Sequence, residues 1–143
     1  MVITLPQSEY QVTFPHPAKK RIATVGGMEI ISYESVGPAA NPYLRVEFMN
    51  NIDTASISNN FRKVLKNYAR LSGLILPEIT ETQDHLGKVG TYSGTKTVGD
   101  VTIKIYGKMV LGENSAINCL ISENLKVFPT EDSAEFLIGI KRK

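Results

Sequence analysis

Residues 53–73 have the sequence DTASISNNFRKVLKNYARLSG, and this stretch decides the fold. Its apolar residues recur at intervals of three and four, which places them on one side of an α-helix. Asp53 can cap the first turn, because its carboxylate can accept hydrogen bonds from free N–H groups, and Gly73 suits the left-handed position that follows a helix. We therefore predict one long amphipathic helix over Asp53–Gly73. Its apolar stripe consists of Ile57, Phe61, Val64, Leu65, Tyr68 and Leu71.

The opposite side of this helix is basic, with Arg62, Lys66 and Arg70 four residues apart and Lys63 beside them. These four residues, the basic ridge, are a candidate anion-binding site for nucleic acid, lipid headgroups or an acidic partner. The plainer interpretation is a solvated outer face. A net charge of +2 is small for a nucleic-acid binder, and no aromatic residues alternate with the charges. We expect no nucleic-acid partner.

The length of 143 residues predicts a single domain over residues 1–143. No apolar run reaches the roughly 18 residues that a transmembrane helix needs. The N-terminus has neither a basic start nor an apolar segment typical of a secretory signal. The expected location is the cytoplasm, or the periplasm or cell envelope if a leader has been removed.

Strand-like patterns fill most of the remaining chain. Residues 43–49 alternate strictly, with Leu44, Val46 and Phe48 in one phase, which predicts a half-buried strand with one face toward the helix. Gly26-Gly27 between two such patterns predicts a two-residue hairpin, and Ser35–Pro42 is predicted to be a loop. The strands predicted before the helix are residues 10–14, 19–25, 28–33 and 43–49.

After the helix, Pro77 makes the apolar segment Leu74–Ile79 an edge strand or a bulge, and Glu81–Gly87 is predicted to be a turn. Gly99-Asp100 and residues 112–115 are short turns, so the strands that they join should be antiparallel neighbours. Thr130 is a candidate N-cap of a short C-terminal helix, which should fray into the basic tail 141–143. The strands predicted here are residues 88–97, 101–111 and 116–125.

Strands, one long helix, strands and one short helix follow one another along the chain. Segregated elements of this kind predict an α+β fold, in which one long helix and one C-terminal helix pack on an antiparallel sheet as an α-β-α sandwich.

The segment Tyr10-Gln11-Val12-Thr13-Phe14-Pro15 resembles the "Y-x-V-x-F-P" opening of PsbP-like and DcrB-like domains. The hairpin strands, the helix, the glycine-bearing segment Leu86–Thr97 and the final Ala134–Ile140 segment also match this family in order. The resemblance covers nearly the whole chain and implies an α-β-α sandwich that acts through its surface. Members of the family include an oxygen-evolving-complex subunit, a protein that binds a small GTPase, bacterial envelope lipoproteins and chaperones of secreted effectors. No site residue of the family carries over to this chain.

The sequence offers little chemistry. Cys119 is the only cysteine and lies in an apolar segment, which indicates an inert buried thiol. His16 and His85 do not form a metal-binding spacing. Gly90–Thr97 lacks both the spacing of a phosphate loop and a following helix. The loop carboxylates Glu78, Glu81 and Asp84 are more typical of a solvated loop than of an acid–base pair. We expect no metal, no cofactor and no enzymatic activity.

Aromatic and Met side chains on the less buried phases of the strands are candidate partner-binding residues, because such side chains recur in recognition surfaces. They are Tyr33, Tyr43, Met49 and Tyr106, with Val110 beside them. The competing interpretation is that the C-terminal helix covers them. The loop Ser35–Pro42 could form the rim of this surface.

The sequence therefore predicts a non-enzymatic binding domain that presents a sheet face and an adjoining loop to a protein partner. One alternative is a carrier of a small apolar ligand, lipid or metabolite, held between the helix and the sheet. A second, weaker alternative is an unrecognised hydrolase.

Overall fold

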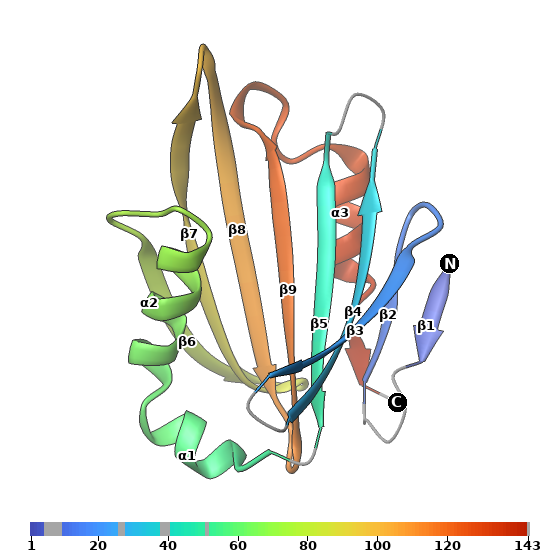
Figure 1. Ribbon diagram of the computed structural model, residues 1–143, viewed down its shortest axis with the longest axis vertical. Coiled ribbons are helices and arrows are strands. Elements are labelled where there is room, and N and C mark those ends of the chain that lie inside the picture. Colours follow the sequence, from blue (N-terminus) through green and yellow to red (C-terminus); the bar gives the residue numbers. More distant parts are fainter. Residues whose placement is uncertain (5–9, 26–27, 38–40, 51, 143) are drawn as a thin grey trace.

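A seven-stranded antiparallel sheet, ordered β3-β4-β5-β9-β8-β7-β6, forms the centre of the molecule (Figure 1). The computed structural model describes residues 1–142 except 5–9, 26–27, 38–40 and 51. One half of the sheet is a meander that runs from its edge to its middle: β3 (Lys19–Val25), β4 (Met28–Val36) and β5 (Tyr43–Asn50). The other half returns from the opposite edge: β6 (Glu78–Asp84), β7 (Gly87–Val98), β8 (Val101–Leu111) and β9 (Ser115–Asn124).

Because β5 is central and β6 is an edge strand, the chain between them must cross the sheet. It does so through α1 (Thr54–Asn59) and α2 (Phe61–Leu71). A second, three-stranded sheet has the order β1-β2-β10 and consists of β1 (Val2–Thr4), β2 (Tyr10–Thr13) and β10 (Lys141–Arg142). Between β9 and β10 lie the 3-10 helix η2 (Leu125–Val127) and α3 (Glu131–Ile138).

The large sheet has two faces, set by the alternation of side chains along each strand. On one face, which we call the α2 face, Met49, Ile105 and Met109 pack with Leu65 of α2. On the other, the α3 face, Val46, Ile117 and Ile121 belong to the same cluster as Val12 of the small sheet and Phe136 of α3. Each face therefore has its own apolar core.

Glycine allows α2 to approach the α2 face closely. Phe61, Leu65 and Ala69 are buried on one side of α2, and a Cβ added to Gly90 of β7 would lie 2.5 Å from Leu65 Cδ1. On the same face, the ring of Tyr92 covers Gly107 of β8, where an added Cβ would lie 2.0 Å from Tyr92 Cζ. Bare backbone at these two positions is what fits the helix and the tyrosine ring against the sheet.

The α3 face is closed by buried aromatic and polar contacts. The rings of Phe14 and Phe136 lie 5.0 Å apart, and Tyr10 donates a 2.7 Å hydrogen bond to the carbonyl of Leu86. The buried carboxylate of Glu123 accepts from the backbone N–H of Thr130 and from the hydroxyls of Thr130 and Ser133 at the start of α3. A carboxylate at this position favours the helix because the helix N-terminus carries partial positive charge.

The predicted α+β class, a sheet with one long helix and a C-terminal helix in an α-β-α sandwich, is wrong. The protein is mostly β, with a seven-stranded sheet, a three-stranded sheet and small helices. The predicted long helix is broken at Asn60, whose φ of −123° is not helical. Ser and Asn are weak helix formers, and they make up much of α1, which buries no residue.

The ends of the predicted helix are confirmed: Asp53 accepts a hydrogen bond from the N–H of Ser56, and Gly73 has a φ of 91°. The strand pairs around Gly99 and residues 112–115 and the cap at Thr130 are also confirmed. Residues 81–84 are not a turn but part of β6, and residues 141–142 form β10. Gly26-Gly27 and residues 38–40 of the predicted loop Ser35–Pro42 lie outside the described residues.

Candidate functional site

The α2 face is only partly covered. Helix α2 packs on β6 and β7, and Figure 1 shows it on that side of the sheet. The part of the α2 face formed by β4 and β5 carries a row of polar side chains, which we call the open half. Its residues are Ser32, Glu34, Tyr43, Arg45 and Glu47.

Hydrogen bonds and ion pairs hold the outer part of the open half in place. Tyr43 donates a 2.7 Å hydrogen bond to Glu34 Oε2, and Arg21 Nη2 lies 2.9 Å from Glu34 Oε1. The hydroxyl of Tyr43, aided by the charges of Arg21 and Arg45, lowers the pKa of the Glu34 carboxyl, although burial opposes this. Burial and the bond to Glu34 raise the pKa of Tyr43. Glu34 is therefore held ionised and Tyr43 neutral around neutral pH.

Arg45 is the residue of the open half whose hydrogen bonding is incomplete. It lies between Glu34 and Leu120 on the neighbouring strands, and its Nη2 lies 3.1 Å from Glu47 Oε1. Among the described residues, its Nε is the buried side-chain polar atom without a hydrogen-bond partner. A buried donor without an acceptor destabilises a fold by about 1–3 kcal/mol. The Arg45 side chain as a whole is 37% exposed, so an incoming acceptor meets the open part of the guanidinium rather than the closed-off Nε.

A groove of about 400 Å³ lies between α2 and the open half. Ile30, Tyr68, Leu71 and Leu120 supply apolar wall, and Leu71 is 81% exposed. Burial, together with the negative charge of Glu47, raises the pKa of Tyr68. The polar lining comes from Arg45, Glu47, Ser72, Tyr92 and Asn118.

The floor of the groove is rigidly bonded. Tyr92 donates a 2.9 Å hydrogen bond to Asn118 Oδ1, and both side chains are buried. The rings of Tyr68 and Tyr92 have centroids 6.3 Å apart, and Tyr68 donates to Met49 Sδ at 3.7 Å. These contacts join the groove side of α2 to the sheet, so the groove has a fixed shape on one side.

The four predicted aromatic and Met residues do not share a face, and the expectation that they do is wrong. Tyr33 is paired with Val46 in the register and therefore lies on the α3 face. Both Tyr33 and Tyr106 pack against the α3-face core. Tyr43 lies on the α2 face with Met49, which is buried in the α2-face core. The structure thus brings one of the four, Tyr43, into the open half. The binding role of these residues stays a prediction.

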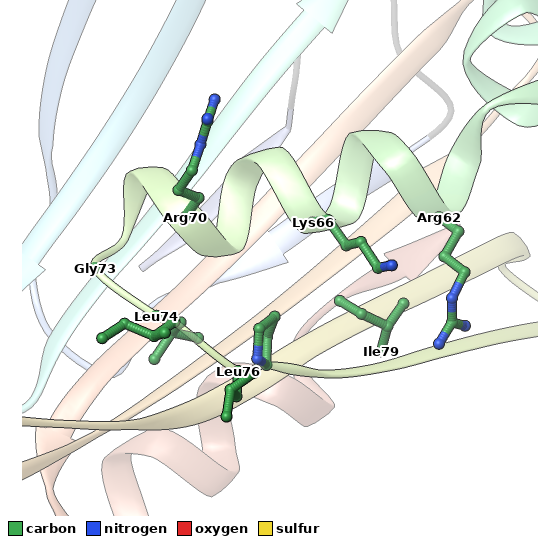
Figure 2. Close-up of a pocket in the computed structure, with 9 residues that line it drawn as sticks. Arg62, Lys66, Arg70, Gly73, Leu74, Leu76 and Ile79 are labelled. Carbon is green, nitrogen blue, oxygen red and sulfur yellow. The ribbon is translucent and has the colours of Figure 1, made fainter.

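The basic ridge is exposed along its whole length, at Arg62, Lys63, Lys66 and Arg70. Three of these residues, Arg62, Lys66 and Arg70, line a hollow of about 820 Å³ with the segment 73–79 that connects α2 to β6. Figure 2 shows Arg62 and Lys66 extending from α2 toward the side of Ile79, whereas Arg70 points the other way. The ridge therefore does not stand alone but adjoins an apolar segment.

Reactive groups are dispersed or buried. Cys119 is buried in the α3-face core, and burial raises the pKa of its thiol to about 12. His16 Nε2 lies 2.8 Å from Asp132 Oδ2 near the start of α3, whereas His85 is exposed at the turn between β6 and β7. Glu78, Glu81 and Asp84 lie along the exposed edge strand β6. Within the described ranges, no three His, Cys, Asp or Glu side chains gather as a metal site.

No protein-family model and no curated protein matches this chain. The resemblance to PsbP-like and DcrB-like domains therefore stays a prediction. In the part of the chain that the structure describes, none of the helices combines the length and apolar character that crossing a membrane requires.

Sequence reasoning missed Arg45, Glu47 and Leu71 as groove residues. A signal for the first two was present, because charges of opposite sign at positions 45 and 47 fall in one phase of an alternating strand. Leu71 was assigned to the buried stripe of the helix. It lies at the last position of α2 and on its groove side, where the sheet no longer covers it.

Proposed function

We propose that this protein is a non-enzymatic binding domain that holds a protein partner in the groove beside the open half of the α2 face. The observation that carries the proposal is the groove itself, in which the part-exposed guanidinium of Arg45 lies beside an apolar wall. A partner that brings an acceptor to the exposed part of this guanidinium gains a charge-assisted hydrogen bond. We therefore assign the side chains of the open half to binding a partner rather than to stabilising the fold.

The groove also indicates what the partner presents. Leu71, Ile30 and Leu120 offer apolar contact, which favours a large aliphatic or aromatic side chain as the anchor. The acceptor for the Arg45 guanidinium is a carboxylate or a backbone carbonyl. A volume of about 400 Å³ accommodates a few side chains rather than a folded element. The proposed ligand is therefore a short segment with a bulky apolar residue beside an acceptor.

Peptides selected from a random phage-displayed library on the immobilised protein test this proposal. The decisive variant is Arg45→Lys, because lysine keeps the positive charge near Glu47 but lacks the planar fork of donors of the guanidinium. We expect the dissociation constant of selected peptides, measured by fluorescence anisotropy, to rise at least about tenfold in R45K.

The matched control is Arg21→Lys, because Arg21 also pairs with a carboxylate on this sheet but lies at the edge strand β3. The dissociation constant for R21K should equal that of the unmodified protein. Peptides that bind R45K as tightly as the unmodified protein, or a selection in which no peptide depends on the groove, would refute the proposal.

A small-ligand carrier is the second candidate, and the apolar wall of the same groove favours it. The space that was predicted to hold such a ligand, between the helix and the sheet, is filled by Phe61 and Leu65 against Gly90. Native mass spectrometry of freshly purified protein separates the two candidates. A bound small molecule that is lost in a Leu120→Arg variant supports the carrier, and its absence supports the protein-binding domain.

A further inference from the structure

A second surface, away from the groove, combines exposed apolar side chains with basic ones. Ile75 and Leu76 lie in the segment between α2 and β6 and are 91% and 92% exposed. They are the two most exposed large apolar residues in the described part of the chain. Two adjacent aliphatic side chains that are almost fully in water gain free energy when another molecule covers them.

The local sequence explains why this segment projects. Gly73 has a φ of 91° and ends the helix, and Leu74 turns inward to pack over Gly94. Pro77 then delays the start of β6 until Glu78. With Leu74 anchored and β6 not yet begun, the side chains of Ile75 and Leu76 are left outside the core.

The cations beside this segment form no ion pair with any acidic residue that the structure describes. Arg62, Lys66 and Arg70 line the same hollow of about 820 Å³ as Ile75 and Leu76 (Figure 2). Among the described residues, none of the three forms an ion pair; Arg70 donates to the neutral side chain of Asn67. Their charge is therefore available to an external anion.

The neighbouring surface offsets this charge only in part, by Glu81, which shares the phase of Ile79 on β6, and by Glu78. A second hollow on the other side of Ile75 and Leu76 carries one carboxylate, Glu78, and one further cation, Lys96. Lys96 donates a 3.2 Å hydrogen bond to the carbonyl of Ser72, which keeps its charge beside the segment. The surface as a whole is apolar at its most exposed point and basic around it.

We propose that Ile75, Leu76 and the adjoining cations Arg62, Lys66 and Arg70 form a docking surface for an anionic lipid bilayer. Aliphatic side chains reach the boundary of the acyl chains while long basic side chains stay at the level of the headgroups. Anionic headgroups supply the charge that the basic residues lack. This surface adds a membrane contact that the proposed partner groove does not require.

A bilayer fits this surface better than other occupants. The apolar residues are aliphatic and project outward, and no aromatic ring is available among the lining residues to stack on nucleic-acid bases. A single bound lipid would need an enclosed apolar cavity, whereas Ile75 and Leu76 are almost wholly exposed. The arrangement is that of a shallow membrane anchor.

The chain contains no tryptophan, so Leu76→Trp places a single reporter in the proposed contact. Phosphatidylcholine vesicles, with or without phosphatidylglycerol, are the probe. We expect the L76W fluorescence to shift to the blue and to be quenched by brominated acyl chains only when phosphatidylglycerol is present. Ile138→Trp, on an exposed position of α3, should show neither effect.

Vesicle sedimentation then measures the contribution of each part. We expect the partition coefficient of Arg62→Ala/Lys66→Ala to fall about fivefold for each charge removed, and Ile75→Asp/Leu76→Asp to lose binding. The control Lys20→Ala/Lys126→Ala removes two exposed charges elsewhere and should leave the partition coefficient unchanged. Added salt should weaken binding of the unmodified protein, because the charges are exposed.

Several results would overturn the membrane proposal. These are equal binding to neutral and anionic vesicles, normal binding by I75D/L76D, capture of lipid monomers without vesicle binding, or no vesicle binding at all. Arg45→Lys should bind vesicles normally, so failure here and failure of the groove proposal can be told apart.

Discussion

The two halves of the α2 face are built by opposite means. Over β6 and β7, glycine at position 90 lets Phe61 and Leu65 of α2 lie directly on the sheet. Over the outer part of β4 and β5, Glu34, Tyr43, Arg45 and Glu47 satisfy most of one another's polar groups instead. The first half stabilises the fold through close packing. The second adds little stability, since partly exposed ion pairs contribute little, and it leaves a surface free to bind.

The largest effect is expected from a substitution in the half of the α2 face that α2 covers, over β6 and β7. Gly90→Ala adds a Cβ that would lie 2.5 Å from Leu65 Cδ1 and 2.7 Å from Phe61 Cζ, so these two buried side chains, or α2 with them, must shift. We expect the free energy of unfolding, measured by urea denaturation, to fall by about 3 kcal/mol.

Gly94→Ala is the matched control for this change. On the same strand, the added Cβ would meet the flexible end of Leu74 at 3.1 Å, so the loss should be at most about 1 kcal/mol. Equal losses in the two variants would show that α2 does not depend on Gly90.

A smaller effect is expected where the two halves meet. Tyr92→Phe removes the donor to Asn118 Oδ1 and leaves a buried acceptor unsatisfied. The free energy of unfolding should fall by about 1–2 kcal/mol. Tyr106→Phe serves as the control, because no hydrogen bond of the Tyr106 hydroxyl is seen among the described residues, and its change should stay within about 0.5 kcal/mol. Similar losses in both variants would contradict the assigned role of Tyr92.

The open half should tolerate change in the isolated protein. Arg45→Met removes the pair with Glu47 but also the unsatisfied Nε. These two changes oppose each other, so the free energy of unfolding should fall by less than about 1 kcal/mol. A loss as large as that of G90A would end the distinction between a stabilising half and a binding half.

The smallest effect is a pH dependence. Because the pKa of Glu34 is lowered in the folded protein, chiefly by the hydrogen bond from Tyr43, its contribution is present above the ordinary carboxyl pKa. That contribution is lost as the pH falls through the lower, folded-state pKa. Since the site is partly open to solvent, we expect about 0.5 kcal/mol or less.

Melting temperatures of the unmodified protein and of Tyr43→Phe, measured from neutral to acidic pH, test this dependence. The two proteins should differ at neutral pH and converge in acid. A difference that persists or grows in acid would show that Tyr43 acts through something other than the Glu34 carboxylate.

Local signals in the sequence predicted the elements with strong patterns. Alternation of apolar and polar residues predicts the strands around Ile105 and Ile117, and helical spacing predicts α2 from Phe61 onward. Edge strand β6 carries no alternation, because most of its side chains are exposed on both faces, and for this reason the sequence predicts a turn at its residues 81–84. Strands β1 and β10 are too short to show a pattern and exist through pairing with β2.

The sites were harder to predict, because a phase within a strand does not say which face of the sheet it occupies. Tyr33 and Tyr43 were grouped together, but the register places Tyr33 opposite Val46 and thus on the α3 face. Helical spacing alone was enough to find the basic ridge at Arg62, Lys66 and Arg70. The unsatisfied donor of Arg45 depends on three neighbouring strands and on α2, which no local pattern records.

The most direct test of the central claim is to map where a selected peptide binds, using amide chemical shifts of the isotope-labelled protein. The division of the α2 face predicts that the shifts concentrate on β4, β5 and the last turn of α2, around Ile30, Arg45 and Leu71. Shifts confined to β6–β8 or to the α3 face would contradict it.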